Sequence, residues 1–142
     1  MSQQHPNLEI IGKFFDAYSK FDAEAMKEVV AEDVTWTIPG HHPMSGTKKG
    51  ITEVLAYFSK LSESGFKADP IVLGVNDHYV IDCHRGWSTR EDGNNVDMLW
   101  CLLWKIKDGK IVEVVNFAAD QHEADRFFYK AYQLKPIQER MA

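Results

Sequence analysis

The sequence predicts an α+β fold, in which helices and an antiparallel sheet occupy separate stretches of the chain. Helical spacing of apolar residues dominates roughly the first 60 residues, with one strand inserted. Strand alternation and turn signals dominate from about Phe66 to Ala119. Because the two patterns do not alternate along the chain, they favour α+β over a βαβ arrangement. The 142 residues and the 44% hydrophobic content suffice for one core, so we expect a single domain over residues 1–142.

Three helices are expected in the N-terminal part. The first covers Leu8 to Tyr18, where apolar side chains recur at three- and four-residue spacings. The second opens at Asp22, a residue type that caps helix N-termini, and stops at the acidic residues 32–33. The third begins at about Lys48 and carries one apolar stripe. Each helix therefore buries one side.

One strand is expected between the second and third helices. Val34, Trp36 and Ile38 alternate with threonines, which is typical of a strand with one buried face. Residues 39–43 contain two prolines and a glycine, so we expect a loop there.

Four strands are expected in the second half, because three turn signals divide it at residues 76–77, 92–95 and 108–109. The pair Asp108-Gly109 is the strongest of these signals, since a type I′ turn needs positive φ at both central positions. Short connections of this kind predict a meander of antiparallel hairpins.

The third of these strands, Val96 to Ile106, is apolar on both faces, and such a strand must be covered on both sides. One face holds Leu99, Cys101 and Leu103, and the other holds Met98, Trp100, Leu102 and Trp104. We expect one face to hold the helices and an enclosed pocket. We expect the tryptophan-rich face to meet a second subunit, which predicts a homodimer through the sheet.

Several classes of function are disfavoured by composition. The net charge is −5 and no basic run occurs, so nucleic acid and anionic membranes are poor partners. No stretch has the length and apolarity of a membrane span or a secretory signal, so we expect a cytoplasmic protein. Cys83 and Cys101 lack metal-type spacing, and neither a zinc site nor a disulfide framework is indicated. No phosphate loop or nucleophile elbow is present, so we expect no cofactor and no metal.

Local motifs then suggest a family. They are Phe21-Asp22 through Val34 with Trp36 following, Pro43-Met44-Ser45-Gly46 leading into Gly50, Lys107-Asp108-Gly109-Lys110-Ile111, and Phe117 followed by Asp120-Gln121. With the order of elements from about Asn7 to Tyr132, they resemble the nuclear-transport-factor-2-like (NTF2-like) superfamily, and within it the SnoaL-like branch. The resemblance implies a cone in which a curved antiparallel sheet wraps around the N-terminal helices and encloses a small-molecule pocket. That branch includes polyketide cyclases and is related to ketosteroid isomerases.

The ketosteroid isomerase constellation is missing from this chain. That enzyme uses a carboxylate base, a tyrosine and a protonated acid. The resemblance places the base position on Ile38, the tyrosine position on Phe14 and the acid position on Cys101 or Leu102. Steroid isomerisation by that constellation is therefore not expected, since proton transfer needs the missing base.

Three residues are candidates for acid–base catalysis. Asp120 matches the position of an acid/base aspartate in SnoaL-like cyclases, but Asp120 with Glu123 three residues later also predicts a capping box that opens a last helix. His41 and His42 lie in the loop after the first strand, and histidine is a residue type that titrates near neutral pH, although a pair of exposed loop histidines is the simpler explanation.

Nine further residues are candidates for ligand binding: Phe14, Tyr18, Trp36, Tyr57, Phe58, His84, Asp97, Cys101 and Asn116. The aromatic members are core residues of which some should line the pocket. Asp82 and His84 share one strand face, and a His–Asp pair that includes Asp97 could orient a carbonyl or a water if these faces are concave. Solvated strand ends explain the same polar residues without function.

The resulting hypothesis is a cofactor-independent SnoaL-like protein that binds a small, mostly apolar carbonyl or polyketide-like molecule. It would carry out acid–base chemistry of the cyclase or isomerase kind. The alternative is a ligand-binding or interaction module without turnover, in which Asp120 only caps a helix and the histidines face water.

Overall fold

The computed structural model describes residues 5–132 and contains four helices and six strands in these residues. In chain order the elements are α1 (Pro6–Ser19), α2 (Ala23–Val29), β1 (Val30–Ile38), β2 (Gly46–Lys49), α3 (Gly50–Ser62), β3 (Lys67–Val75), β4 (Tyr79–Trp87), β5 (Asp97–Lys107), β6 (Lys110–Ala118) and α4 (Gln121–Ala131). The predicted α+β class is confirmed. Among the described residues, no helix has both the length and the apolar composition that crossing a membrane requires.

The strands form one sheet in the order β2-β1-β6-β5-β4-β3. Every neighbouring pair is antiparallel except β1 and β6, which run parallel. The predicted meander is confirmed as β3 to β6. Asp108 and Gly109 have φ angles of 52° and 76°, as the predicted type I′ turn requires.

The helix starts follow the predicted caps. The carboxylate of Asp22 accepts a hydrogen bond from the Ala25 amide, and the carboxylate of Asp120 accepts one from the Glu123 amide. Two boundaries differ from the sequence prediction. The second helix stops at Val29, because β1 already begins at Val30 and carries the acidic residues 32–33 as strand residues. The short polar strand β2 was not predicted.

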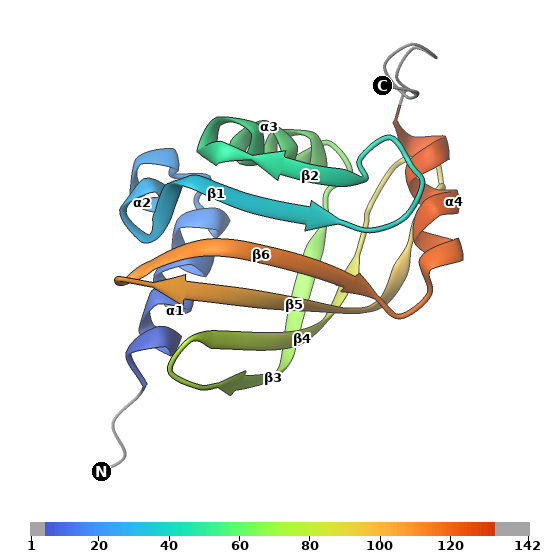
Figure 1. Ribbon diagram of the computed structural model, residues 1–142. Helices are drawn as coiled ribbons and strands as arrows, with labels where there is room; N and C mark the ends of the chain where they lie inside the picture. Colours follow the sequence, from blue (N-terminus) through green and yellow to red (C-terminus); the bar gives the residue numbers. More distant parts are fainter. Residues whose placement is uncertain (1–4, 133–142) are drawn as a thin grey trace.

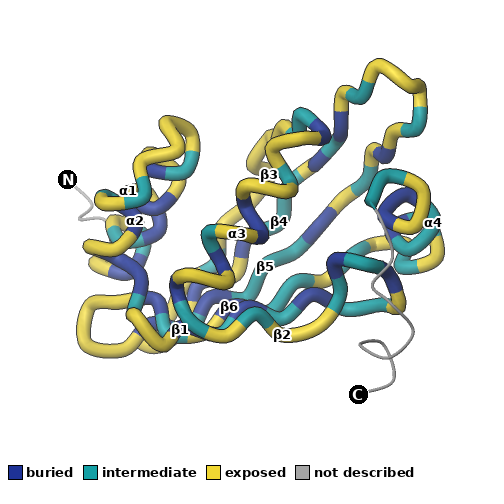
Figure 2. Tube along the Cα trace, turned by 90° about the horizontal axis from the view of Figure 1, so that it is seen from above, coloured by how far each residue is buried: buried dark blue, intermediate teal, exposed yellow. Residues whose placement is uncertain are grey.

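The helices α1, α2 and α4 lie toward the two ends of the sheet, and α3 lies between them (Figure 1 and Figure 2). Both views place α1 and α2 toward one end and α4 at the opposite end (Figure 1 and Figure 2). The core between α1, α3 and the sheet is rich in aromatic rings. Phe14 of α1 contacts Trp104 of β5 with ring centroids 5.0 Å apart, and Trp36 of β1 contacts Phe58 of α3 at the same separation.

The two faces of β5 are oriented opposite to the prediction. Trp104 is fully buried and Trp100 is 8% exposed, so the tryptophan face lies against the helices. The outward face carries Leu99, which is 46% exposed, and the half-buried Cys101. The expectation that the tryptophans meet a second subunit is therefore wrong. Alternation defined the two faces correctly but carried no information on which one the helices cover.

Candidate functional site

A buried acid–base pair lies on the concave face of the sheet, where β4 meets β5. Asp82 has a side chain that is 3% exposed, and its Oδ1 lies 2.6 Å from Nδ1 of His84. The other oxygen, Oδ2, accepts a hydrogen bond of 2.7 Å from the indole Nε1–H of Trp104. Both carboxylate oxygens are thus held by neighbours. An acid group inside an aromatic core is tolerated because each of its oxygens has a partner.

These hydrogen bonds assign the tautomer of His84. The indole can only donate and an ionised carboxylate can only accept, so Nδ1 of His84 carries the hydrogen that Asp82 accepts. In the neutral ring the lone pair is then on Nε2. Within residues 5–132 no hydrogen-bond partner reaches Nε2, and the His84 side chain is 18% exposed. This nitrogen is therefore available to a ligand.

Asn116 of β6 lies on the same face, two strands away. Asp82 pairs with Leu102 in the β4–β5 register, and Leu102 pairs with Asn116 in the β5–β6 register. Two strand spacings separate Asp82 from Asn116 by roughly 10 Å. The half-buried side-chain amide of Asn116 makes no hydrogen bond to any described residue. A small molecule lying over Leu102 could reach both polar groups.

The predicted aromatic ligand-binding residues pack together above this face. Phe14 contacts Tyr18, Trp36 and Phe58, with ring centroids 5.9 to 6.1 Å apart, and Trp36 contacts Tyr57 at 6.5 Å. Burial raises the pKa of both Tyr18 and Tyr57, so their hydroxyl groups stay protonated. Neither hydroxyl has a hydrogen-bond partner among the described residues, so both are available as donors. That these residues line a ligand pocket stays a prediction.

His42 is a buried residue in the loop between β1 and β2, and its ring stacks on Phe128 of α4 at 4.5 Å. Its Nδ1 accepts a hydrogen bond of 3.1 Å from the Met44 amide, and its Nε2 lies 3.9 Å from Oδ1 of Asp125. Burial lowers the pKa of His42 to about 4, although the nearby Asp125 acts in the opposite direction. The ring is therefore neutral at pH 7, and its basic nitrogen is already occupied. His41 is exposed.

Residues of α4 hold this loop in place. Oδ1 of Asp125 accepts hydrogen bonds from the His41 amide and from Nε2 of Gln121, at 3.2 and 3.0 Å. Gly40 has a φ of 100°, and a β-carbon there would lie 2.2 Å from both of these side-chain atoms. Only glycine fits this conformation and this close approach without displacing them.

A small hollow connects the loop to the concave face. It is lined by Ile38, Pro39, His42, Trp100, Asn116, Ala118, Gln121, Ala124 and Phe128. Its volume is about 10 Å³, which is close to the space that one water molecule needs. Trp100, which lines the hollow, stands directly opposite His84 in the β4–β5 register, but neither His84 nor Asp82 lines the hollow.

Three predicted site residues lie outside this arrangement. Asp120 is exposed and serves as the N-cap of α4, as the capping interpretation predicted. Glu123 does not complete the capping box, because its carboxylate pairs with Arg126. Asp97 lies on the outer face and forms two hydrogen bonds with the guanidinium of Arg85, at 2.9 and 2.6 Å. Cys101 also faces outward, so the structure brings neither Asp97 nor Cys101 together with His84.

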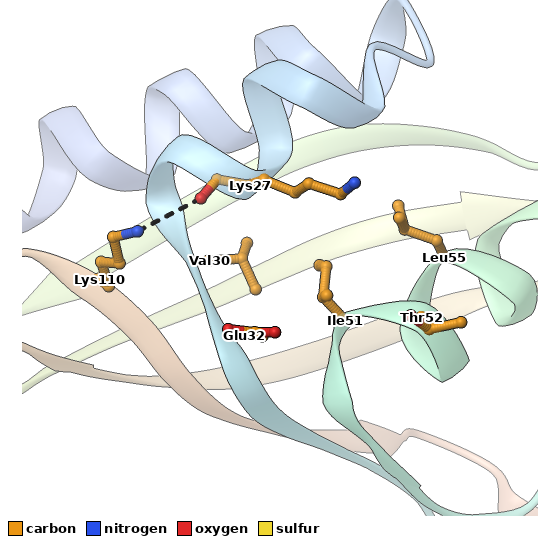
Figure 3. Close-up of a pocket in the computed structure, with 7 residues that line it drawn as sticks. All are labelled: Lys27, Val30, Glu32, Ile51, Thr52, Leu55 and Lys110. Carbon is orange, nitrogen blue, oxygen red and sulfur yellow. Dashed lines mark hydrogen bonds between the residues drawn. The ribbon is translucent and has the colours of Figure 1, made fainter.

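A larger groove of about 460 Å³ lies at the other end of the sheet (Figure 3). Its volume is that of an ordinary ligand pocket. It is lined by Lys27, Val30, Glu32, Ile51, Thr52, Leu55 and Lys110. Lys27 forms an ion pair with Glu24 at 3.4 Å, and Lys110 donates to the Lys27 carbonyl at 3.4 Å. None of the predicted site residues lines this groove, so the candidate site is the concave face despite its smaller hollow.

Sequence reasoning missed two parts of the site. Alternation placed Asp82 and His84 on one face, but the third member, Trp104, depends on the register between β4 and β5. Asp125 was not a candidate, because its position beside His42 arises from a contact between a loop and a helix far apart in the chain. The Asp-x-His spacing within one strand was the only available signal.

Comparison with known proteins gives a consistent picture. A family model described as a SnoaL-like domain matches residues 11–114. An uncharacterised protein of Mycobacterium tuberculosis strain H37Rv, Rv0034, is 26% identical over 129 residues, which cover 86% of this chain and 95% of the relative.

Two solved structures share the architecture. An NTF2-like protein of Burkholderia xenovorans LB400 superposes with a TM-score of 0.78 at 22% identity, over 89% of this chain and 98% of the other. TerC, co-crystallised with polyporic acid, superposes with a TM-score of 0.75 at 18% identity, over 89% and 99% of the two chains. The predicted NTF2-like fold, a cone formed by a curved and unclosed sheet, is confirmed.

Proposed function

Because this chain belongs to the SnoaL-like family, we propose that its concave face binds a small, mostly apolar carbonyl or polyketide-like molecule and catalyses proton transfer on it. The observation that carries the proposal is the Trp104–Asp82–His84 chain of hydrogen bonds, which leaves Nε2 of His84 without a hydrogen-bond partner among residues 5–132. TerC, a protein of the same fold, was co-crystallised with polyporic acid, which is in keeping with a small-molecule site.

In the proposed reaction His84 is the general base. Nε2 takes a proton from the carbon next to a carbonyl group, and the electron pair of the broken C–H bond moves onto the carbonyl oxygen. The carboxylate of Asp82 stabilises the imidazolium that forms, as a buried acid beside a histidine does. The amide of Asn116 is a donor for the oxygen on which negative charge develops. The protonated His84 then returns the proton to the product.

Ligand entry requires some movement in this proposal. The hollow beside Trp100 has room for about one water molecule, which is less than a carbonyl ligand occupies. The ring stack between His42 and Phe128 closes the hollow on the side of α4. Separation of this stack would open the hollow on that side, and a shift of Trp100, which stands opposite His84, would extend it to the acid–base pair.

The test is turnover of a panel of aldol-prone polyketide analogues by the wild type and by His84→Gln. We expect His84→Gln to lose at least about 100-fold in rate while its ligand Kd changes little, because general bases contribute roughly 10²- to 10⁴-fold. His122→Gln, an exposed histidine on α4, is the matched control and should keep the wild-type rate.

Two other outcomes would change the assignment of His84 as the general base. Loss of turnover in Asp120→Asn but not in His84→Gln would place the chemistry at the helix cap. Binding of panel compounds without turnover, unchanged in all variants, would favour the alternative of a ligand-binding module.

We also propose a homodimer formed through the outer face of the sheet. Four large apolar side chains on this face are at least 46% exposed, which is unusual for a surface that stays in water: Val72, Ile81, Leu99 and Phe117. Leu99→Glu should convert the dimer to a monomer in light scattering while preserving the circular dichroism spectrum. A wild-type protein that scatters as a monomer would contradict the proposal.

A further inference from the structure

Two free cysteines face each other on the outer side of the sheet. Cys83 of β4 and Cys101 of β5 are direct partners in the antiparallel register, and both are half-buried. Side chains at directly opposed positions share one face and stand next to each other. The two thiol groups are therefore neighbours although 17 residues separate them in the sequence.

The hydrogen-bond pattern shows which type of pair the cysteines form. The Ser88 amide donates to the Val96 carbonyl and the Ile106 amide donates to the His78 carbonyl, so these pairs are of the hydrogen-bonded type. Hydrogen-bonded and non-hydrogen-bonded pairs alternate along an antiparallel ladder. Residues of β4 an even number of positions from His78 or Ser88 therefore form hydrogen-bonded pairs, and residues an odd number away form non-hydrogen-bonded pairs. Cys83 is five positions from both, so Cys83 and Cys101 form a non-hydrogen-bonded pair.

That type of pair suits a disulfide bond. In non-hydrogen-bonded pairs the Cα atoms are about 4.5 Å apart and the side chains approach more closely. Disulfides require a Cα separation of roughly 4.4 to 6.8 Å, so bridging the two residues demands little backbone movement. Burial raises the pKa of Cys101, and the neighbouring Cys83 thiol raises it further, as expected for two thiols that stand side by side.

We propose that Cys83 and Cys101 form a reversible intrachain disulfide when the protein meets a peroxide. One thiolate attacks a peroxide oxygen and becomes a sulfenic acid as the O–O bond breaks. The second thiolate then attacks that sulfur, the S–O bond breaks, and hydroxide leaves. In total, two thiols and one hydrogen peroxide yield one disulfide and two waters. A small-molecule thiol reverses the reaction by thiol–disulfide exchange.

The bond would lie directly behind the candidate acid–base pair. Asp82 and His84 flank Cys83 in β4 and point to the opposite, concave face. The disulfide would tie β4 to β5 next to Asp82, the residue that holds His84. On the outer face the pair is flanked by Val72 and Phe117, which are their partners on the neighbouring strands.

The experiment treats the folded, reduced protein with hydrogen peroxide and follows free thiols, intact mass and migration on a non-reducing gel. We expect both thiols to disappear, the mass to fall by about 2 Da, one hydrogen being lost from each thiol, and the chain to migrate as a monomer. The reaction should be faster at pH 9 than at pH 7, because the raised pKa of Cys101 limits its thiolate. Dithiothreitol should restore both thiols.

The single variants Cys83→Ser and Cys101→Ser are the controls, and neither should show the loss of about 2 Da. Because subunit contact could cover this face, the oxidation is repeated on Leu99→Glu. An intrachain disulfide in either protein supports the proposal. Its absence from both, or a disulfide that links two chains instead, overturns it.

Discussion

Two histidine–aspartate pairs lie on the inner side of this fold, and they differ in what the histidine can do. In β4 Asp82 is 2.6 Å from His84, and in the contact between loop and α4 Asp125 is 3.9 Å from His42. The first distance is that of a strong hydrogen bond, and the second is too long for one. Proximity of the same two residue types therefore does not by itself define an acid–base pair.

The difference arises from the second partner of each histidine. Nδ1 of His84 is used by the carboxylate, which leaves Nε2 open. Nδ1 of His42 is used by the Met44 amide, so the lone pair of this ring is consumed by the backbone. His42 stabilises its loop, whereas His84 keeps a basic atom for chemistry. A rigid strand fixes one pair and a loop fixes the other, which favours precise geometry in the first.

The strongest test of the contrast is Asp82→Asn. An amide in this place can accept from Trp104 and donate to Nδ1 of His84, which moves the hydrogen of His84 to Nε2 and removes the base. We expect the rate to fall at least about 100-fold and the free energy of unfolding to fall by about 1–3 kcal/mol. Nitrogen NMR of the imidazole ring reports the tautomer without any substrate.

Asp125→Asn is the matched control for that variant. His42, the partner of Asp125, takes no part in the proposed reaction, so the rate of Asp125→Asn should stay within about twofold of the wild type. A twofold change in rate corresponds to less than about 0.5 kcal/mol, since a tenfold change corresponds to about 1.4 kcal/mol. Equal losses of rate in both variants would mean that the two pairs do not differ in function.

Much of the fold could be predicted because its signals are local. Apolar spacing defined the helices, and Asp108-Gly109 defined a turn whose φ angles follow from steric rules. The strand β2 was missed because Gly46–Lys49 is short, polar and without alternation. The parallel pairing of β1 with β6 joins segments far apart in the sequence, and no local pattern encodes it.

The site could be predicted only in part. Alternation put Asp82 and His84 on one face, yet the same alternation could not tell whether that face or the opposite one was concave. The tryptophans of β5 were assigned to the wrong side for this reason. A hydrogen bond such as Trp104 to Asp82 depends on the strand register, which is set by the whole sheet.

The second test concerns pH and His42. Because the pKa of His42 in the folded protein is about 4, against an ordinary value of 6.5, the unfolded chain binds a proton between these values that the folded protein does not. Stability is then fully present above pH 6.5 and is lost as the pH falls toward 4. At about 1.4 kcal/mol per pH unit the loss is at most about 3 kcal/mol.

Urea unfolding of the wild type and of His42→Gln, at pH 7 and at pH 4.5, measures this loss. His42→Gln can still accept from the Met44 amide but cannot titrate, so its stability should fall less between the two pH values. His41→Gln should retain the wild-type dependence, since His41 is exposed. Identical pH dependence in all three proteins would contradict the neutral, buried state of His42.

The smallest expected effect tests the contact that brings His42 near Asp125. Gly40→Ala places a β-carbon 2.2 Å from Asp125 and Gln121 at a φ of 100°. Gly93→Ala is the matched control, because Gly93 has a φ of 82° and a β-carbon added there would meet no atom within 4 Å.

Both variants incur the strain of alanine at positive φ, about 1 kcal/mol. Only Gly40→Ala must also break the hydrogen bonds that Asp125 and Gln121 make, which adds about 1 kcal/mol. Thermal unfolding should therefore show a larger loss for Gly40→Ala, while His84-dependent turnover stays unchanged. Equal losses would mean that the two side chains simply rotate away, and that the position of His42 does not depend on α4.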